Sequence, residues 1–522
     1  MSSGYPIGVS SPIRTAASAS SPPALRSRIA EIDAETVGLH ARLAILAAER
    51  KTIVDALQSV IYPAVLDLPV EITAEIFLQY FTGAQIGGDD PDVQSDPGWV
   101  PPCGPLLLAS ICRRWREIAL SLQAIWSDFF FETRTAFGST EKLLECWLPR
   151  TGTHPLTVAL REFNSNNRIL TSLSPYMHKV HTFTCTIDPD RSFPNDHIQL
   201  PALRSLNVYT VVTLDAGDHD DDAITPITAF MRLPRLREVT LIRCPLPWIL
   251  LPWAQLTTLD IVRVWDVQLL SVLRQTASLE VLALSKISES DLDDETLVRL
   301  AHLRTLKFNR YQREVGMLQK LILPSLTHIE FALPGRRLRW PDPTSHEVLC
   351  FVGLIQRSAC SLRSITISDP TFSDAMACLR AAGPTLEVVK IQDSDWNTFS
   401  MEVFLEQLDS RVADFVPNLK SLSLNPCRVA VEIRYTDLVE VLAYRSQDRG
   451  EGTSRLESFE LVIAGQESPS WPKPSLTELD EGVDKLKVLQ DNGLGINIRC
   501  PQKWIPGVDP LLLRSPLEPR ED

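Results

Sequence analysis

The strongest constraint on the fold is a six-residue apolar pattern, Leu-x-x-Leu-x-Leu, that recurs through the last two thirds of the chain. Successive copies begin 20 to 24 residues apart in the most regular stretch and 33 to 37 apart where longer segments intervene. A recurring unit of this length is typical of stacked structural repeats. The copies are Leu203/Leu206/Val208, Leu236/Val239/Leu241, Leu256/Leu259/Ile261, Leu279/Leu282/Leu284, Leu303/Leu306/Phe308, Leu326/Ile329/Phe331, Leu362/Ile365/Ile367, Leu386/Val389/Ile391, Leu419/Leu422/Leu424 and Leu456/Phe459/Leu461, with Val180/Phe183/Cys185 as an earlier copy.

Each copy is expected to form one short strand. The last two anchors are two positions apart, so both side chains point to one face of the strand, and the first anchor closes the preceding turn. Helix-length segments such as Asp266 to Thr276 and Glu347 to Ser358 separate the copies. We therefore predict an α/β fold in which residues 150–470 form an irregular solenoid with a parallel sheet. The alternative, a β-sandwich of short strands, is disfavoured by the helix-length segments.

The array resembles leucine-rich repeats. In regular members of that family, an Asn or Cys eight residues after the first Leu hydrogen-bonds the adjoining turn. In this chain few copies carry that residue, so the turns are expected to be irregular. The residues at that place include Cys244 and Cys427, but also Val264, Ile287, Pro334 and Pro370.

Upstream of the array, two motifs predict a pair of helices. The first is Leu68-Pro69-x-Glu71-Ile72-x-x-x-Ile76-Phe77, and the second is Leu108-x-x-Ile111-Cys112-Arg113-x-Trp115. Pro69 suits the first position of a helix because its missing N–H costs nothing there, and Glu71 lies in the first turn, where the helix dipole favours an anion. The apolar residues of both motifs recur with helical spacing, which predicts two helices with apolar stripes.

Together the two motifs resemble the F-box, through which substrate receptors of Skp–cullin–F-box ubiquitin ligases bind the small adaptor subunit of the ligase. The F-box-like region covers residues 63–130 and contains a Gly/Asp/Pro-rich insertion at 82–105, longer than the usual break between the helices. Such a loop adds little closure entropy. The alternative is a helical hairpin that only caps the following domain. The resemblance assigns adaptor binding to Leu68, Pro69, Glu71, Ile72, Ile76, Phe77, Leu108, Cys112 and Trp115, and Trp126 also matches the family.

Residues 25–62 are expected to form a long helix with a heptad pattern. The seam positions alternate spacings of four and three over about five heptads, with polar residues at Thr36 and Arg50, as in coiled coils whose register is fixed by polar core residues. Pro63 ends the segment. One interpretation is a homodimer formed through residues 25–60, and the other is a single helix folded onto the F-box-like region. The seam positions are Leu25, Ile29, Ile32, Thr36, Leu39, Leu43, Leu46, Arg50, Ile53, Leu57 and Val60.

The composition is that of a folded protein. Of the 522 residues, 44% are hydrophobic and 22% are charged, and the formal net charge of −14 disfavours binding to a nucleic-acid backbone. Ten cysteines are scattered without a Cys-x-x-Cys pair, as in proteins of a reducing compartment. No apolar run reaches the roughly eighteen residues of a membrane span. We therefore expect a cytoplasmic or nuclear protein with neither a membrane nor a nucleic-acid partner.

The two ends of the chain lack the repeat. Residues 1–24 are rich in Ser, Ala and Pro and contain no acidic residue, which predicts a disordered tail. A mitochondrial transit peptide is the alternative, but four prolines would interrupt its amphipathic helix. Residues 471–522 are Pro-rich and are expected to form a cap followed by a loose tail.

The sequence contains no recognisable catalytic site. Phosphate-binding loops, His-Glu-x-x-His and Gly-x-Ser-x-Gly are absent, and residues 492–495 are too short to hold a phosphate. An acidic cluster, residues 215–222, is more typical of a solvated loop than of a cation or basic-peptide site. We expect a protein that is not an enzyme and binds no cofactor or metal. The alternative is an enzyme whose site is assembled from residues distant in sequence.

A receptor of this kind would hold a protein substrate, unknown in identity, close to the ligase machinery. Repeat solenoids bind partners mainly along the strand face or the adjoining loops. The candidate substrate-binding residues, chosen as solvent-facing strand positions, are Arg204, Arg237, Glu280, Lys307, Arg363 and Lys390. The alternative for each residue is a role in solubility alone, and the alternative for the whole chain is an interaction scaffold unconnected to ubiquitination.

Overall fold

The computed structural model describes residues 21–59, 68–83, 104–132, 137–163, 172–187, 199–210, 226–288, 297–308, 316–333, 345–394, 396, 398–409, 415–426, 435–447, 454–462 and 476–499. The chain divides into two compact units, Met1–Ile76 and Phe77–Asp522. Within the described ranges, no helix combines the length and the apolar character needed to cross a membrane.

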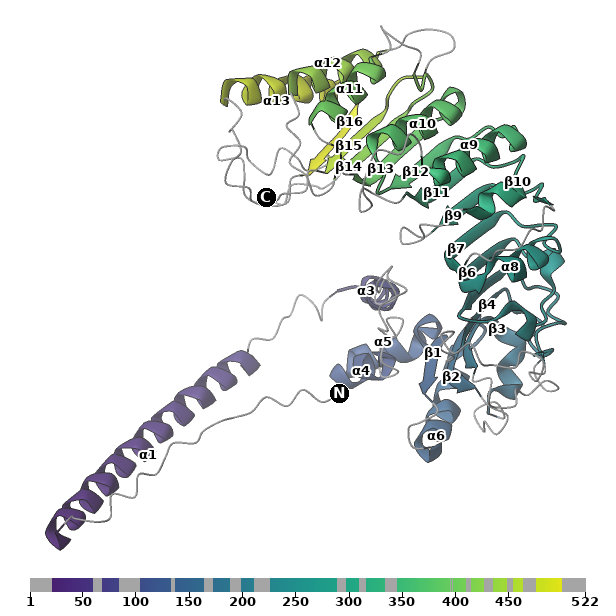
Figure 1. Cartoon of the computed structure of the whole chain (residues 1–522). Helices are drawn as coiled ribbons and strands as arrows, with labels where there is room; N and C mark the ends of the chain where they lie inside the picture. Colours follow the sequence, from purple (N-terminus) through teal and green to yellow (C-terminus); the bar gives the residue numbers. More distant parts are fainter. Residues whose placement is uncertain are drawn as a thin grey trace. The chain divides into compact units, whose positions relative to one another are not determined.

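Among the described residues of the second unit, fourteen strands form one parallel sheet. They lie side by side in chain order, and β8 and β10 form a separate two-stranded parallel sheet (Figure 1). The strands are β1 (Asp128–Glu132), β2 (Leu156–Phe163), β3 (Val180–Ile187), β4 (Ser205–Thr210), β5 (Glu238–Ile242), β6 (Thr258–Trp265), β7 (Val281–Ser288), β8 (Val298–Arg299), β9 (Thr305–Phe308), β10 (Leu321–Ile322), β11 (His328–Ala332), β12 (Ser364–Ser368), β13 (Val388–Ser394), β14 (Ser421–Pro426), β15 (Ser458–Val462) and β16 (Gly495–Arg499).

The apolar repeat sets the register of this sheet. Leu206, Val239 and Leu259 are direct partners on β4, β5 and β6, and all three are buried. Each anchor thus packs beside the same anchor of the next repeat, so neighbouring repeats bury each other's apolar surface. The same row continues through Leu282, Leu306, Ile329, Ile365, Val389, Leu422, Phe459 and Ile496.

The prediction of an α/β fold with a large parallel sheet is confirmed, and the arrangement is consistent with a leucine-rich-repeat-like solenoid. The β-sandwich alternative is wrong, because every pairing between described strands is parallel and fourteen of those strands share one sheet.

Helices cover the outer side of the curved sheet between successive strands (Figure 1). Helix α9 joins the core of the sheet, since Phe351 stacks on Phe331 of β11 with ring centroids 5.2 Å apart. In several other repeats short 3-10 turns take the place of a helix, among them η5 (Leu246–Trp248), η6 (Trp253–Gln255) and η7 (Gly316–Lys320). The helices of this unit beyond the F-box-like region are α6 (Phe137–Trp147), α8 (Asp266–Leu273), α9 (His346–Ser358), α10 (Phe372–Ala382), α11 (Thr398–Leu408), α12 (Tyr435–Arg445) and α13 (Leu476–Asp491).

The sheet extends beyond residues 150–470 at both ends. Strand β1 begins at Asp128, directly after the F-box-like helices, and β16 lies inside the segment expected to form the C-terminal cap. Neither strand carries the Leu-x-x-Leu-x-Leu pattern, because β1 reads Asp-Phe-Phe-Phe-Glu and β16 reads Gly-Ile-Asn-Ile-Arg. These end strands therefore lack the sequence signal that identifies the others.

The N-terminal helices differ from the prediction at one place. Helix α1 (Pro22–Ser59) and helix α3 (Val70–Gly83) form where the heptads and the first motif predict them. The second motif is expected to form one helix but forms two, α4 (Gly104–Ile111) and α5 (Arg113–Ser121). Between them Cys112 has extended backbone, and its Sγ accepts a hydrogen bond from the Trp115 N–H at 3.4 Å. Cys112 is thus an N-cap, although the apolar spacing continues through it.

Left-handed residues recur at an equivalent position in five repeats, just after the strand or within its last residues. Arg243, Arg263 and Lys286 have φ of 57°, 62° and 55°, and Asp369 and Asp393 have φ of 54° and 51°. Each stands seven residues after the first Leu of its copy, one residue before the place that Asn or Cys occupies in regular repeats. Arg243 and Asp369 directly follow β5 and β12, whereas Arg263, Lys286 and Asp393 lie within the last three residues of β6, β7 and β13. This backbone conformation is uncommon for residues other than glycine.

A buried arginine fixes the connection between α11 and β14. Arg445 donates hydrogen bonds to the carbonyls of Leu408 at 2.7 Å, Phe415 at 2.6 Å and Val416 at 2.9 Å. Val416 has a φ of 49°, a rare conformation for a β-branched residue. One guanidinium thus donates hydrogen bonds both to the carbonyl at the C-terminal end of α11 and to the carbonyls of two residues that precede β14.

Candidate functional site

Helix α3 has one buried face and one exposed apolar face. Thr73 and Phe77, four residues apart, are buried. Val70, Ile72 and Ile76 are each about half exposed, although apolar side chains on a helix ordinarily face a core. Because residues four apart lie on one side of a helix, the Ile72 and Ile76 side chains form a continuous apolar strip.

Phe77 packs on α5 through an aromatic pair. The rings of Phe77 and Trp115 meet edge to face, with centroids 5.0 Å apart and planes at 68°. Arg116 donates from Nε to the Ala109 carbonyl at 2.7 Å and so ties α5 to α4. Phe77, α4 and α5 thereby pack as one small helical cluster.

Two tryptophans join this cluster to the sheet. Trp126 donates from its indole N–H to the Ala119 carbonyl of α5, and Trp147 donates to the Trp126 carbonyl, both at 2.7 Å. The two indole rings meet edge to face at 5.0 Å, and the Arg150 guanidinium lies 5.0 Å from the Trp126 ring centroid. Trp126 is thus fully buried between α5 and the start of β1.

The structure divides the nine predicted adaptor-binding residues by exposure. Leu68 to Ile76 belong to the first compact unit, and the remaining four belong to the second. Phe77 and Leu108 are buried by packing within the chain, which leaves little of either side chain for direct contact with a partner. Cys112 caps α5. Pro69, Glu71, Ile72 and Ile76 are exposed, Leu68, Cys112 and Trp115 are half-buried, and Phe77 and Leu108 are buried.

Sequence reasoning missed several exposed apolar residues of the same helices as site candidates. Val70 and Tyr80 are exposed on α3, and Leu106, Leu107 and Ile111 are exposed on α4. The helical phase of α3 relative to Phe77 was the available signal for Tyr80, since it stands four residues after Ile76. For α4 there was no such signal, because the break at Cys112 changes which of its residues face the core.

The six candidate substrate-binding residues fall into two sets. Lys307 on β9 and Lys390 on β13 lie on strands as predicted. Arg204, Arg237, Glu280 and Arg363 each lie one residue before a strand begins, which corrects their assignment as strand positions. Their backbone carbonyls bridge repeats, as when Arg204 accepts hydrogen bonds from the N–H groups of both Arg237 and Glu238 at 2.9 Å.

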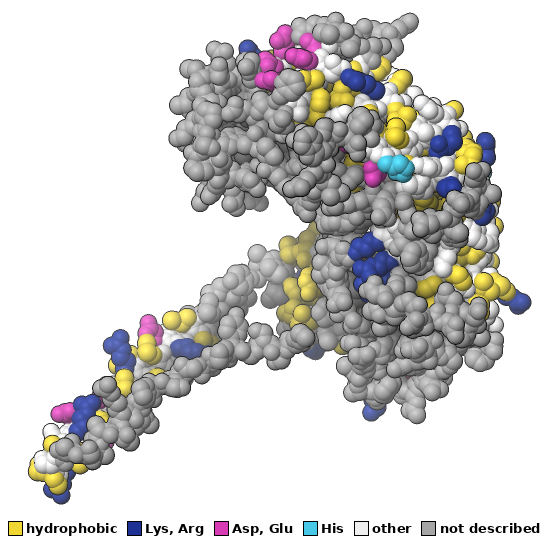
Figure 2. All heavy atoms as spheres, in the orientation of Figure 1, with side chains coloured by type: hydrophobic (Ala, Val, Ile, Leu, Met, Phe, Trp, Pro, Cys, Tyr) yellow, Lys and Arg dark blue, Asp and Glu magenta, His cyan; other side chains and the backbone are white. Residues whose placement is uncertain are grey.

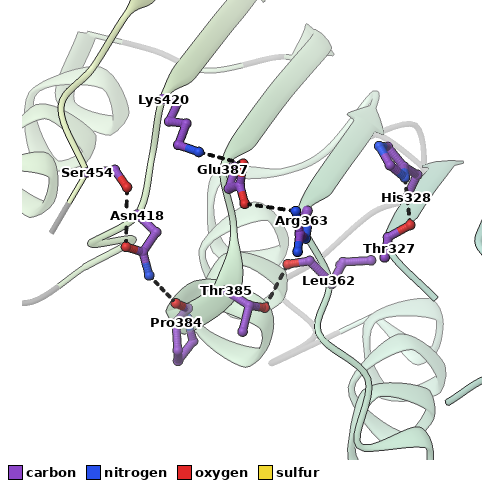
Figure 3. Close-up of polar contacts among 10 residues, drawn as sticks. All are labelled: Thr327, His328, Leu362, Arg363, Pro384, Thr385, Glu387, Asn418, Lys420 and Ser454. Carbon is purple, nitrogen blue, oxygen red and sulfur yellow. Dashed lines mark hydrogen bonds and ion pairs between the residues drawn. The ribbon is translucent and has the colours of Figure 1, made fainter. Parts of the chain in front are cut away.

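Charged side chains at these pre-strand positions pair across repeats (Figure 3). The Glu387 carboxylate accepts a hydrogen bond from the Lys420 ammonium at 2.9 Å and lies 3.6 Å from the Arg363 guanidinium. The hydrogen bond from Lys420 and the two positive charges lower the pKa of the Glu387 carboxyl. Arg363 and Lys420 therefore bracket a carboxylate, so their charges are partly satisfied by this chain.

A carboxyl group lies half-buried on the solvent-facing row of the sheet. Asp260 of β6 and Lys307 of β9 belong to one register row, separated by Ala283 of β7. Burial raises the pKa of Asp260, and the charge of Lys307 opposes that rise. Burial, with a smaller contribution from Asp260, also raises the pKa of Tyr209 on β4. This part of the sheet holds an acid whose charged form is disfavoured.

Three cysteines of the repeat region are deeply buried. Burial raises the pKa of Cys244 to about 12 and the pKa values of Cys185 and Cys378 further, so these thiols are protonated and unreactive. Within the described ranges, no three His, Cys, Asp or Glu side chains are grouped to hold a metal ion. The acidic cluster of residues 215–222 lies outside the described residues.

No protein-family model and no curated protein matches this chain. Among solved structures, the Toll–Spatzle complex, a molecular hub in Drosophila development and innate immunity, is similar to this chain with 13% sequence identity and a TM-score of 0.28. The match covers 64% of this chain and 45% of the other, so this chain spans less than half of that structure's length.

Proposed function

We propose that this chain is a non-catalytic substrate receptor of a Skp–cullin–F-box ubiquitin ligase, cytoplasmic or nuclear in location. The F-box-like helices dock on the adaptor subunit, and the repeat sheet binds a protein substrate. The receptor makes no bond itself. It raises the concentration of substrate lysines near the ubiquitin-charged enzyme of the ligase.

The exposed strip of α3 is the single observation that carries this proposal. It holds the apolar side chains Ile72 and Ile76 near the motif residues Pro69 and Glu71, in a helix that also carries the buried residues Thr73 and Phe77. Covering a half-exposed isoleucine by a partner is favourable by about 1 kcal/mol. A strip of this kind is typical of a helix that docks on another protein.

The test is binding of the purified adaptor subunit by the full chain. The double variant Leu68→Ala/Pro69→Ala and the variant Ile72→Ala/Ile76→Ala are both expected to lose the adaptor in a pull-down. Leu349→Ala, which removes an apolar side chain of α9 that is exposed at least as much as Ile72 and Ile76, is the matched control and is expected to keep the adaptor. Equal capture of the adaptor by all variants would contradict the proposal.

One observation favours a second candidate, a repeat scaffold unconnected to ubiquitination. Phe77, Leu108 and Trp126 are buried within the chain, as expected of helices that cap the first strands of a solenoid. The same pull-down separates the two functions, because a scaffold of this kind has no affinity for the adaptor. The strip on α3 favours the receptor, since a cap alone has no need of exposed isoleucines.

A further inference from the structure

Helix α1 exposes its entire apolar seam. Between residues 22 and 53 the described side chains of α1 are all exposed, including Leu25, Ile29, Ile32 and Leu39. Figure 2 shows apolar and charged side chains alternating along this helix. A helix of this kind gains most of its stability when its apolar stripe packs against another surface. We therefore expect the exposed stripe of α1 to bind a partner.

The seam divides into two kinds of heptad position. In a heptad, position d stands three residues after position a. With this assignment the two polar residues of the seam, Thr36 and Arg50, are both at a positions, and every described d position is apolar. The a positions are Ile29, Thr36, Leu43, Arg50 and Leu57, and the d positions are Leu25, Ile32, Leu39, Leu46 and Ile53.

Charges flanking the seam favour a parallel partner identical to this chain. In a parallel pair, position g of one helix faces position e of the next heptad on the other. Arg28 at g then faces Asp33 of a second copy, and Glu35 at g faces His40 of a second copy. Arg28 contacts Glu31 of its own helix at 2.8 Å, and its five N–H donors allow both contacts.

The antiparallel arrangement brings like charges together. In that orientation g positions face g positions, so full overlap of the two seams pairs Glu35 with Glu49 and Arg42 with its own copy. Like charges across an interface are destabilising. The charge pattern of this helix therefore distinguishes between the two orientations.

Arg50 is the one cation inside the seam, and the parallel register supplies its counterion. Each residue at an a position inserts between four residues of the facing helix, which include the neighbouring g position. For Arg50 that g residue is Glu49 of the second copy. A single polar a position of this type fixes register and strand number at some expense of stability.

We propose that the chain is a homodimer held by a parallel, in-register, two-stranded coiled coil of α1. This inference does not rest on the proposed function and concerns a different surface. Dimerisation places two repeat sheets and two F-box-like regions in one particle, so two weak contacts with a multivalent partner act together.

The decisive comparison uses two neighbouring residues of α1. Leu43 is 63% exposed and Ile45 is 67% exposed, but only Leu43 lies in the seam. In sedimentation equilibrium of the full chain, wild type and Ile45→Asp are expected to be dimers at micromolar concentration. Leu43→Asp is expected to weaken association on the order of 100-fold or more. A monomeric wild type, or equal effects of the two variants, would overturn the proposal.

Orientation is tested by cross-linking through Ile32 at a d position. In the parallel dimer Ile32→Cys lies opposite its own copy and is expected to form a disulfide-linked dimer on mild oxidation. In the antiparallel pair the two cysteines are separated by about 27 Å, and no such link forms. The wild-type chain, with its ten cysteines, gives the background, and a cross-link no stronger than this background overturns the parallel arrangement.

Substitution of Arg50 provides an independent check. Arg50→Leu removes the one charge from the seam and is expected to tighten association or raise the number of strands, because the polar layer is lost. If α1 were only a solvated helix, the same change would leave both the association constant and the mass unchanged, and that result would count against the coiled coil.

Discussion

Ile76 and Phe77 are neighbours in α3 with opposite environments, since Ile76 is 48% exposed and Phe77 is 1% exposed. Phe77 packs edge to face on Trp115, so Phe77→Ala is expected to lower the free energy of unfolding by about 3 kcal/mol or more. Ile76→Ala is expected to change it by less than about 0.5 kcal/mol. Urea denaturation followed by Trp fluorescence measures both. Comparable losses of stability would contradict the two-faced helix.

Arg445 is expected to be essential for the connection between α11 and β14. Arg445→Met removes the guanidinium donor from the carbonyls of Leu408, Phe415 and Val416, of which Val416 keeps the Leu419 N–H at 3.3 Å, and should reduce stability by about 3 kcal/mol. Arg445→Lys should also be destabilising, because an ammonium lacks the planar fork that reaches three carbonyls. Amide hydrogen exchange of residues 415–426 reports the effect locally, and unchanged protection in Arg445→Met would contradict this role.

The half-buried carboxyl of Asp260 makes stability depend on pH. Because burial raises the pKa of Asp260, its neutral form is the one favoured by folding. The stabilisation is present below the pKa of the unfolded state and is lost as the pH rises through the folded-state pKa. Asp260→Asn is therefore expected to raise the melting temperature at pH 7 and to leave it unchanged at strongly acidic pH. A lower melting temperature for Asp260→Asn at pH 7 would show that the charged form is the stabilised one.

The C-terminal end of α9 offers a stabilising substitution. Ala359 is exposed, has φ of 47° and donates its N–H to the Ile355 carbonyl at 3.0 Å. A left-handed residue at this place is usually glycine, so Ala359→Gly is expected to stabilise the chain by about 1 kcal/mol. Ala381→Gly, inside α10, is the matched control and is expected to destabilise by a similar amount. A loss of stability in both variants would exclude the conformational explanation.

Repeat periodicity was sufficient to predict the parallel sheet, and the same spacing explains the register of its strands. Leu206, Val239 and Leu259 pair directly because a fixed apolar spacing leaves one alignment that buries every anchor. The end strands β1 and β16 were not predicted, since a terminal repeat has a neighbour on one side only and need not carry the full pattern.

Side-chain environment was predicted less well than the presence of helices. The motif assigned Ile72, Ile76 and Phe77 to one docking surface. The helix turns by about 100° per residue, so Phe77 faces a different side from Ile72 and is buried. The break at Cys112 was missed because capping depends on one residue's backbone, which apolar spacing does not reveal. Likewise, Arg204 and Arg363 precede their strands because backbone pairing begins one residue later than the apolar pattern suggests.

The most direct test of the proposed receptor function is calorimetric titration of the full chain with the purified adaptor subunit. The wild type and Leu349→Asp are expected to bind one adaptor per chain with equal affinity. Ile76→Asp is expected to show no measurable binding while keeping the circular dichroism spectrum of the wild type. Absence of binding by the wild type, or undiminished binding by Ile76→Asp, would contradict adaptor docking through the exposed strip of α3.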